Sequence, residues 1–200
     1  MDRRQFCTAG ATALSLGAAG AMSLPIGRGL AAVPPYSAAT AVYKVVFDER
    51  HELGRSFGAA AARRGVRTGA INGDVTALWL HDLRSHWARG GGAVAGLTTM
   101  PALFSLEQMA KDHWLPVTVR ILHRADAGYV AAHRLTAASS NWPRLAAALA
   151  DGAAWPERVA EALIALAPAG GERRTGVFAC TQATRFAAPE PGLVSWVIGA

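Results

Sequence analysis

The chain has 200 residues, of which 52% are hydrophobic and 17% charged, and its formal charge is +6 at neutral pH. This composition is typical of a folded globular protein and excludes a disordered chain, which combines low hydrophobicity with high net charge. The basic residues are scattered, and beyond the N-terminus only Arg63-Arg64 and Arg173-Arg174 are adjacent pairs. That distribution lacks the dense basic patch of a nucleic-acid-binding protein, so we expect no nucleic-acid partner.

The N-terminal sequence has the pattern of an export signal peptide. Arg3 and Arg4 precede Phe6, a weakly apolar run rich in Ala and Gly spans 9–24, and small residues follow. This order of charged, apolar and small residues predicts a twin-arginine signal peptide over 1–31. The alternative is an N-terminal helix whose arginines are only a solvated end.

The signal is expected to be removable. Its apolar run is too short and too weakly apolar for a permanent membrane anchor, which needs about 20 strongly apolar residues. Cleavage is expected after Ala31 or Ala32. Residues 32–40 then form an extended leader and 41–200 the α/β domain. We expect the twin-arginine translocase to export the chain folded, to the periplasm or beyond the cell.

The first half of the domain alternates strands and helices. β-branched and apolar runs bounded by turn residues indicate strands, and Ala-rich or amphipathic runs indicate helices. The predicted strands are 43–47, 66–71, 93–97 and 117–122, and the predicted helices are 51–64, 74–89 and 101–114. This repeat is typical of a parallel sheet covered by helices on both faces, a Rossmann-like three-layer α/β domain.

The second half is less regular. Short strands are expected near 129–130 and 133–135, followed by Ala-rich helices over 143–150 and 156–166, each beginning with a proline suited to a first helical turn. Two final strands are predicted over 175–180 and 193–198. We take the whole of 41–200 as one domain because its length suits a single core.

In open parallel sheets, ligands bind where strands end and loops enter helices. This rule selects Asp48 after the first strand, Asp74 and Thr76 after the second, and Thr98 and Thr99 after the third. The threonines at a helix start could hold an anion. The alternative is that they, like Asp74, only cap helices.

Two patterns raise enzymatic alternatives. Gly54-Arg-Ser56-Phe-Gly58 has the letters of a nucleophile elbow, but Ser56 falls inside a predicted helix, not on the required turn between strand and helix. The possible ligands of a metal site would be His81, Asp82, His86, Asp112 and His113. Because His81 and His86 are five residues apart, they do not share a helix face. We therefore predict no metal site and assign no catalytic residue.

No phosphate-binding or dinucleotide-binding glycine motif is found in the sequence, so no cofactor is expected. Cys7 lies in the signal, which leaves Cys180 as the single cysteine of the exported domain. We expect a buried Cys180 in a short strand, with an intermolecular bridge or a reactive thiol as alternatives.

A twin-arginine signal with Arg3, Arg4 and Phe6 on a small domain without a cofactor motif resembles the small accessory subunits of bacterial periplasmic flavin-dependent dehydrogenases. The resemblance covers the signal and the overall size. It implies an exported small subunit that carries the signal for, and supports, a larger oxidoreductase acting on an alcohol, aldehyde or sugar. The alternatives are a periplasmic small-molecule-binding protein that uses the loops at Asp48, Asp74 and Thr98, and a stand-alone hydrolase or metal-dependent enzyme.

Overall fold

A computed structural model of the chain describes residues 42–126, 129–150, 152–166, 170–180 and 192–199. The predicted signal residues Arg3, Arg4 and Phe6 and the cleavage positions Ala31 and Ala32 lie outside this part. The signal peptide, its cleavage and the leader therefore stay predictions.

The first half of the domain has the predicted element types. Strand β1 is Lys44–Asp48, helix α1 is Glu52–Arg63 and strand β2 is Thr68–Ile71. The next predicted helix is divided into a short α-helix, a π-helical turn and a second α-helix, which are α2 (Thr76–Leu78), η1 (Trp79–Leu83) and α3 (Arg84–Ala88). Strand β3 is Val94–Thr99 and helix α4 is Met100–Lys111.

The second half holds a long hairpin that the sequence only partly revealed. Strands β4 (Val117–Asp126) and β5 (Tyr129–Ala138) are each 10 residues long, so the two short strands expected near 129–135 are one continuous strand. Then come α5 (Trp142–Leu149), the 3-10 turn η2 (Gly152–Ala154), α6 (Trp155–Ile164), β6 (Arg173–Ala179) and β7 (Leu193–Ile198).

The sheet is mixed, and the prediction of a mostly parallel Rossmann-like sheet is wrong. Its seven strands lie in the order β2-β1-β3-β7-β4-β5-β6. Only the pairs of β1 with β2 and with β3 are parallel, and the other four pairs along the described sheet are antiparallel. The β-α repeat did give β3 and β4 the same direction. However, β7 from the end of the chain inserts antiparallel between them and hydrogen-bonds to both.

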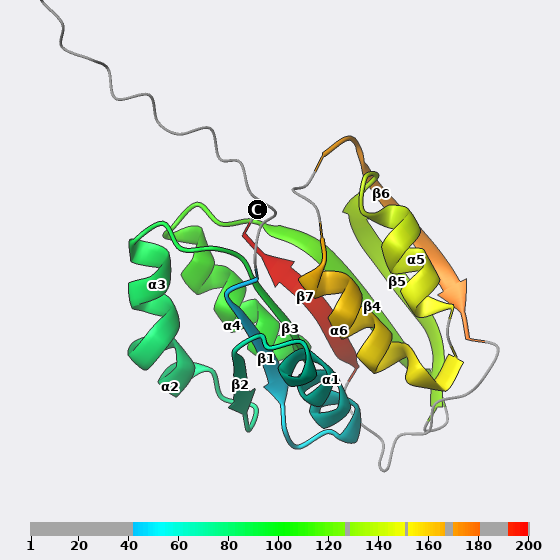
Figure 1. Cartoon of the computed structure of the whole chain (residues 1–200), viewed down its shortest axis with the longest axis horizontal. Coiled ribbons are helices and arrows are strands. Elements are labelled where there is room, and N and C mark those ends of the chain that lie inside the picture. Colours follow the sequence, from blue (N-terminus) through cyan, green and yellow to red (C-terminus); the bar gives the residue numbers. More distant parts are fainter. Residues whose placement is uncertain (1–41, 127–128, 151, 167–169, 181–191, 200) are drawn as a thin grey trace, which may run out of the picture. The chain divides into compact units, whose positions relative to one another are not determined.

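Helices cover both faces of the sheet (Figure 1). On one face α1, α5 and α6 bury Phe57, Leu145 and Trp155 against the strands, and on the other α3 and α4 bury Trp87 and Leu106. Alternation along the strands supplies the two faces. In the described part of the chain, no helix is long and apolar enough to cross a membrane.

The close packing of α1 on β1 requires Gly54. A Cβ atom built on Gly54 would lie 2.2 Å from the carbonyl oxygen of Asp48, a backbone atom that cannot rotate away. The variant Gly54→Ala should therefore lose about 1–3 kcal/mol of unfolding free energy, a typical cost of overpacking, when measured by urea denaturation. In the control variant Gly69→Ala, the nearest atom would be a Lys44 side-chain carbon at 3.3 Å. We expect a change within about 0.5 kcal/mol there, and an equal loss in both variants would contradict the steric explanation.

Candidate functional site

Asp48 lies at the end of β1 as predicted, but its carboxylate is already paired inside the protein. Arg50 donates from Nε to Oδ1 at 2.9 Å and from Nη2 to Oδ2 at 2.6 Å, and His51 Nε2 lies 3.8 Å from Oδ2. Burial by itself would raise the pKa of Asp48, yet the hydrogen bonds and charge of Arg50 lower it overall. The carboxylate is fully buried, so it fastens the turn after β1 and has no free oxygen facing solvent.

Asp74 and Thr76 form a local cap. The backbone N–H of Thr76, the first residue of α2, donates to Asp74 Oδ1 at 2.8 Å. This bond, made at the exposed surface, lowers the pKa of the Asp74 carboxyl. The N-cap position of α2 is Val75 and not the expected Asp74, but the Asp74 carboxylate still satisfies one of the free N–H groups that begin the helix.

The two threonines of β3 are buried and do not form an anion site. Thr98 Oγ1 accepts a hydrogen bond from Trp196 Nε1 at 3.0 Å and donates to the carbonyl oxygen of Thr99 at 3.2 Å. Thr99 occupies the N-cap position of α4 without a side-chain cap bond. Both are at most 4% exposed, because β3 is central and covered on both faces. The structure therefore does not assemble a ligand site from the predicted strand-end residues.

The residues considered as possible metal ligands contact other side chains and do not converge on one point. Asp82 accepts a hydrogen bond from Tyr43 at 2.7 Å and pairs with Lys44. Burial would raise its pKa, but these two partners lower it overall. His86 stacks on the Tyr43 ring at 3.5 Å, whereas His113 lies near Trp87. Within the described ranges, no three potential ligands come together as a metal site would require.

Ser56, the candidate nucleophile of the hydrolase alternative, lies in the second turn of α1. A nucleophile elbow needs the serine on the sharp turn between a strand and a helix, where its hydroxyl and the following N–H face the substrate. The structure therefore gives no support to an elbow at Ser56.

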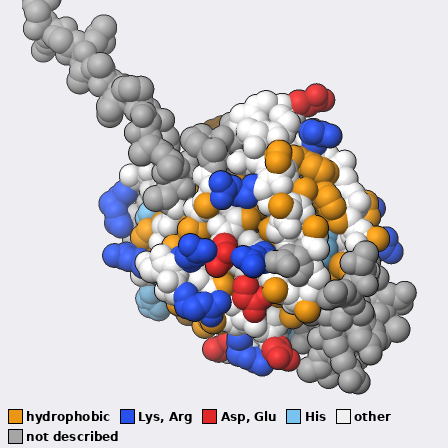
Figure 2. Space-filling view, turned by 45° about the vertical axis from the view of Figure 1, so that its right-hand side comes forward, with side chains coloured by type: hydrophobic (Ala, Val, Ile, Leu, Met, Phe, Trp, Pro, Cys, Tyr) orange, Lys and Arg blue, Asp and Glu red, His pale blue; other side chains and the backbone are white. Residues whose placement is uncertain are grey.

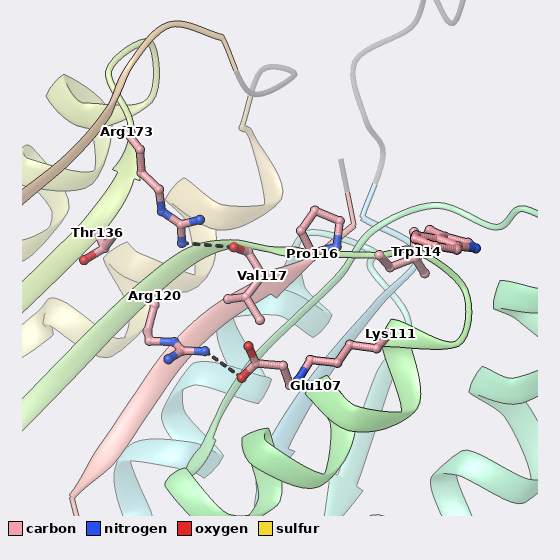
Figure 3. A pocket seen from close by; sticks show the side chains of 9 residues that line it. Glu107, Lys111, Trp114, Pro116, Val117, Arg120, Thr136 and Arg173 are labelled. Carbon is pink, nitrogen blue, oxygen red and sulfur yellow. Dashed lines mark hydrogen bonds and ion pairs between the residues drawn. The ribbon is translucent and has the colours of Figure 1, made fainter. Parts of the chain in front are cut away.

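A groove of about 680 Å³ lies between the C-terminal half of α4 and strands β4 to β6 (Figure 3). Lys111 and Glu107 project from α4, Arg120 from β4 and Arg173 from β6. Arg120 Nη2 pairs with Glu107 Oε2 at 2.7 Å, and Arg173 Nη2 donates to the carbonyl oxygen of Val117 at 3.0 Å. Three cations face one carboxylate, so the groove has a surplus of positive charge and suits an anionic group.

Trp114 forms one rim of the groove and is 92% exposed. It follows the end of α4 and has a φ of 58°, a left-handed conformation that is uncommon for a bulky residue. Burying a tryptophan is worth more than burying almost any other side chain. An indole held in this position and left in water is therefore typical of a binding surface.

The hydrophobic surface continues along α4. Met100 and Phe104 are 39% and 61% exposed, and they precede Glu107 and Lys111 at spacings of three and four residues. Because residues at these spacings lie on one side of a helix, the stripe leads along α4 to the groove.

Beside this stripe, one face of β4 to β6 has no helix over it in the described chain, since α5 contacts β5 and β6 from the other face. The strand registers place two rows of side chains on the uncovered face. One row is Arg120, Thr136 and Thr175, and the other is Leu122, Arg134 and Val177. Arg134 is exposed, and Val177 is 63% exposed. We call the groove, the α4 stripe and these two rows the α4–β6 surface.

Positive charge is not confined to this groove, since Arg64, Arg144 and Arg158 line a second groove together with Glu161. In the view of Figure 2, lysine and arginine side chains are spread among hydrophobic ones and lie beside carboxylates. A pair of this kind is Arg64 with Glu161, whose Nη2 and Oε1 atoms are 3.1 Å apart. Exposed pairs of this type contribute little to stability and select no particular ligand.

Sequence reasoning did not find the α4–β6 surface. Lys111 and Arg120 lie on the consecutive elements α4 and β4, but Arg173 lies on β6, more than 50 residues later, and no short motif links the three. A signal was present at Trp114, a tryptophan directly before Leu115-Pro116 at the end of a predicted helix. Comparisons of the chain with protein-family models, with curated proteins and with solved structures found no match.

Proposed function

We propose that the chain is an exported accessory subunit whose α4–β6 surface binds an acidic face of a larger partner protein. The observation that carries the proposal is the pairing of a 92% exposed Trp114 with the positive groove of Arg120 and Arg173. Tryptophan and arginine are the residues most enriched at interface hot spots. The partner that the predicted export signal favours is an oxidoreductase without a signal of its own.

The chemistry of the surface suits a protein partner. The exposed apolar side chain of Phe104 lies on α4, that of Trp114 follows the end of α4, and that of Val177 lies on β6. The cationic side chains of Arg120 and Arg173 line the groove beside Trp114. An acidic partner segment would pair with the guanidinium groups while its apolar side chains covered the indole. Arginine forms two parallel hydrogen bonds to a carboxylate, which fixes the orientation of the partner.

Export of the partner tests this proposal. In cells producing the double variant Trp114→Ala, Arg173→Glu, we expect this chain to reach the periplasm at its normal level. A signal-less partner that depends on it should fall at least tenfold there, because losing a hot spot of about 2 kcal/mol weakens binding roughly 30-fold. The measurement is quantitative proteomics of the periplasmic fraction, compared with a strain in which Arg3-Arg4 is replaced by Lys-Lys.

Arg144→Glu is the matched control, because Arg144 is an exposed arginine on α5, over the other face of the sheet. It should leave the partner's export unchanged. If the Lys-Lys strain loses this protein alone, the accessory function is contradicted. A partner protein could be absent from the periplasm of the Lys-Lys strain and still be present in that of the strain with Trp114→Ala, Arg173→Glu. In that case the α4–β6 surface is not the docking site.

A small-molecule-binding function is the second candidate, and the size of the groove favours it. Ligand pockets typically measure about 300–1,000 Å³ and use a few convergent polar groups. Arg120, Arg173 and the hydroxyl of Thr136 would provide such groups for a carboxylate. A rise in the melting temperature of the isolated chain with citrate or phthalate, lost in Arg173→Glu, would support this function, since only a ligand of the native state stabilises it.

A further inference from the structure

A series of hydrogen-bonded polar side chains crosses the interior of the domain, on the face of the sheet that α6 covers. Ser195 of β7 lies 2.8 Å from His123 Nε2, and His123 Nδ1 lies 2.7 Å from His133 Nδ1. His133 Nε2 then lies 3.2 Å from the Cys180 sulfur, just after β6. Serine and both histidines are at most 1% exposed, whereas Cys180 is half-buried. Of these four side chains, the Cys180 thiol is thus the one that molecules in solution can reach.

Hydrogen-bond geometry gives these groups a consistent proton arrangement. A neutral imidazole has one N–H donor and one bare nitrogen acceptor. If the Cys180 thiol donates to His133 Nε2, then His133 Nδ1–H donates to His123 Nδ1, and His123 Nε2–H donates to Ser195. Every bond in the series then has one donor and one acceptor, and His133 presents its basic nitrogen to the thiol.

The packing of Trp155 fixes the two histidine rings and shields them from solvent. The Trp155 ring of α6 stacks on His123 with centroids 4.0 Å apart and lies 5.1 Å from the His133 ring. Burial lowers the pKa of His133 to about 4 and that of His123 well below its ordinary value, with a further contribution from His133. Burial also raises the pKa of the Cys180 thiol. At neutral pH the pair is therefore a protonated thiol beside a neutral base.

Cys180 borders an apolar cavity of about 220 Å³. Among the described residues, the others that line it are Leu149, Ala150, Gly152, Phe178 and Ala179. None of these five side chains carries a hydrogen-bond donor. Acyl transfer develops a negative oxygen and relies on donors placed around it. Exchange with a disulfide develops charge on sulfur and needs only an attacking thiol, a base and room for the leaving group.

We propose that Cys180 is a reaction site, at which a small apolar disulfide enters this cavity and exchanges with the thiol while His133 acts as the base. The Cys180 sulfur forms a bond to one sulfur of the disulfide, and the S–S bond of that molecule breaks. The thiol proton passes to His133 Nε2 and then to the leaving sulfur, so a mixed disulfide and one free thiol are produced. The site is independent of the α4–β6 surface.

The test uses the full chain with Cys7→Ser, so that Cys180 is the single thiol, and 2,2′-dithiodipyridine as the neutral, apolar probe. Among the described residues, the titrating groups in contact are His123, His133 and Cys180, and Ser195 and Trp155 pack beside them. If His133 acts as the base, the second-order rate constant for reaction of Cys180 with the probe should change less than about threefold between pH 5.5 and 7.5. A thiol that reacts only as the free thiolate would instead accelerate about tenfold per pH unit.

His133→Leu should restore the tenfold rise per pH unit and react at least tenfold more slowly than the parent at pH 6. Relative to free cysteine, the parent should also prefer the neutral probe over the larger dianionic 5,5′-dithiobis(2-nitrobenzoate) by at least tenfold. Cys180→Ser gives the blank, and mass spectrometry should find one thiopyridyl group on Cys180. A tenfold rise per pH unit in the parent itself overturns the proposal, even if His133→Leu fails to fold.

Discussion

The variant Trp155→Ala should lose about 3–5 kcal/mol of unfolding free energy, the usual cost of removing a large buried aromatic side chain. Trp155 is fully buried and packs against both His123 and His133. Its indole N–H is buried and has no hydrogen-bond partner in the described part of the chain. The loss should therefore come from packing alone, and urea denaturation at pH 7.5 measures it.

Two further variants separate packing from other causes. Trp155→Phe keeps an aromatic ring, and the indole N–H that it removes has no partner among the described residues, so it should cost less than half of the alanine loss. Trp114→Ala removes the same side chain from a position that is 92% exposed, and its effect should stay within about 0.5 kcal/mol. A similar loss at both tryptophans would contradict the burial argument.

Acid should destabilise the domain through the buried histidine pair. The pKa of His133 falls from an ordinary value of 6.5 to about 4 in the folded protein, because burial disfavours the charged ring. Between these values the unfolded chain binds more protons than the folded one, so the stability falls as the pH falls. From His133 alone we expect a loss of about 2–3 kcal/mol between pH 7 and pH 4.5, with His123 adding to it.

Urea denaturation at a series of pH values measures this slope. Asp48 and Asp82 act in a separate range, since their folded pKa values are lowered and their contribution is lost as the pH falls below 3.8. The double variant His123→Leu, His133→Leu replaces both rings by apolar side chains of similar size and should remove most of the slope between pH 7 and 4.5. A parent protein equally stable at both values would show that the imidazoles are not buried as neutral rings.

The existence and type of most elements followed from local patterns. The strand predicted over 193–198 is confirmed as Leu193–Ile198, and all six of its residues are buried. The helix predicted over 51–64 is α1, Glu52–Arg63, and it is followed by Gly65, whose φ of 74° suits a residue after a helix. The helix expected to begin at Asp74 begins two residues later, at Thr76, whose N–H donates to the Asp74 side chain.

The order of the strands did not follow from such patterns. The β-α repeat gave the direction of β1 to β4, but a periodicity of two or 3.6 residues says nothing about which distant strand inserts between them. The insertion of β7 made the sheet mostly antiparallel. It also buried Thr98 against Trp196, which removed the threonine from the predicted ligand loop.

The sequence by itself determined the hydrophobic core segments, the main helices and strands and the local caps, because each depends on residues within a few positions of one another. The tertiary structure alone decided the two candidate sites. Arg120 on β4 and Arg173 on β6 line the same groove, and Cys180 is connected to Ser195 through two histidines on separate strands. The contacts of the histidine series join residues separated by 10 to 72 positions along the chain. The energy that selects this strand pairing is spread over the whole core.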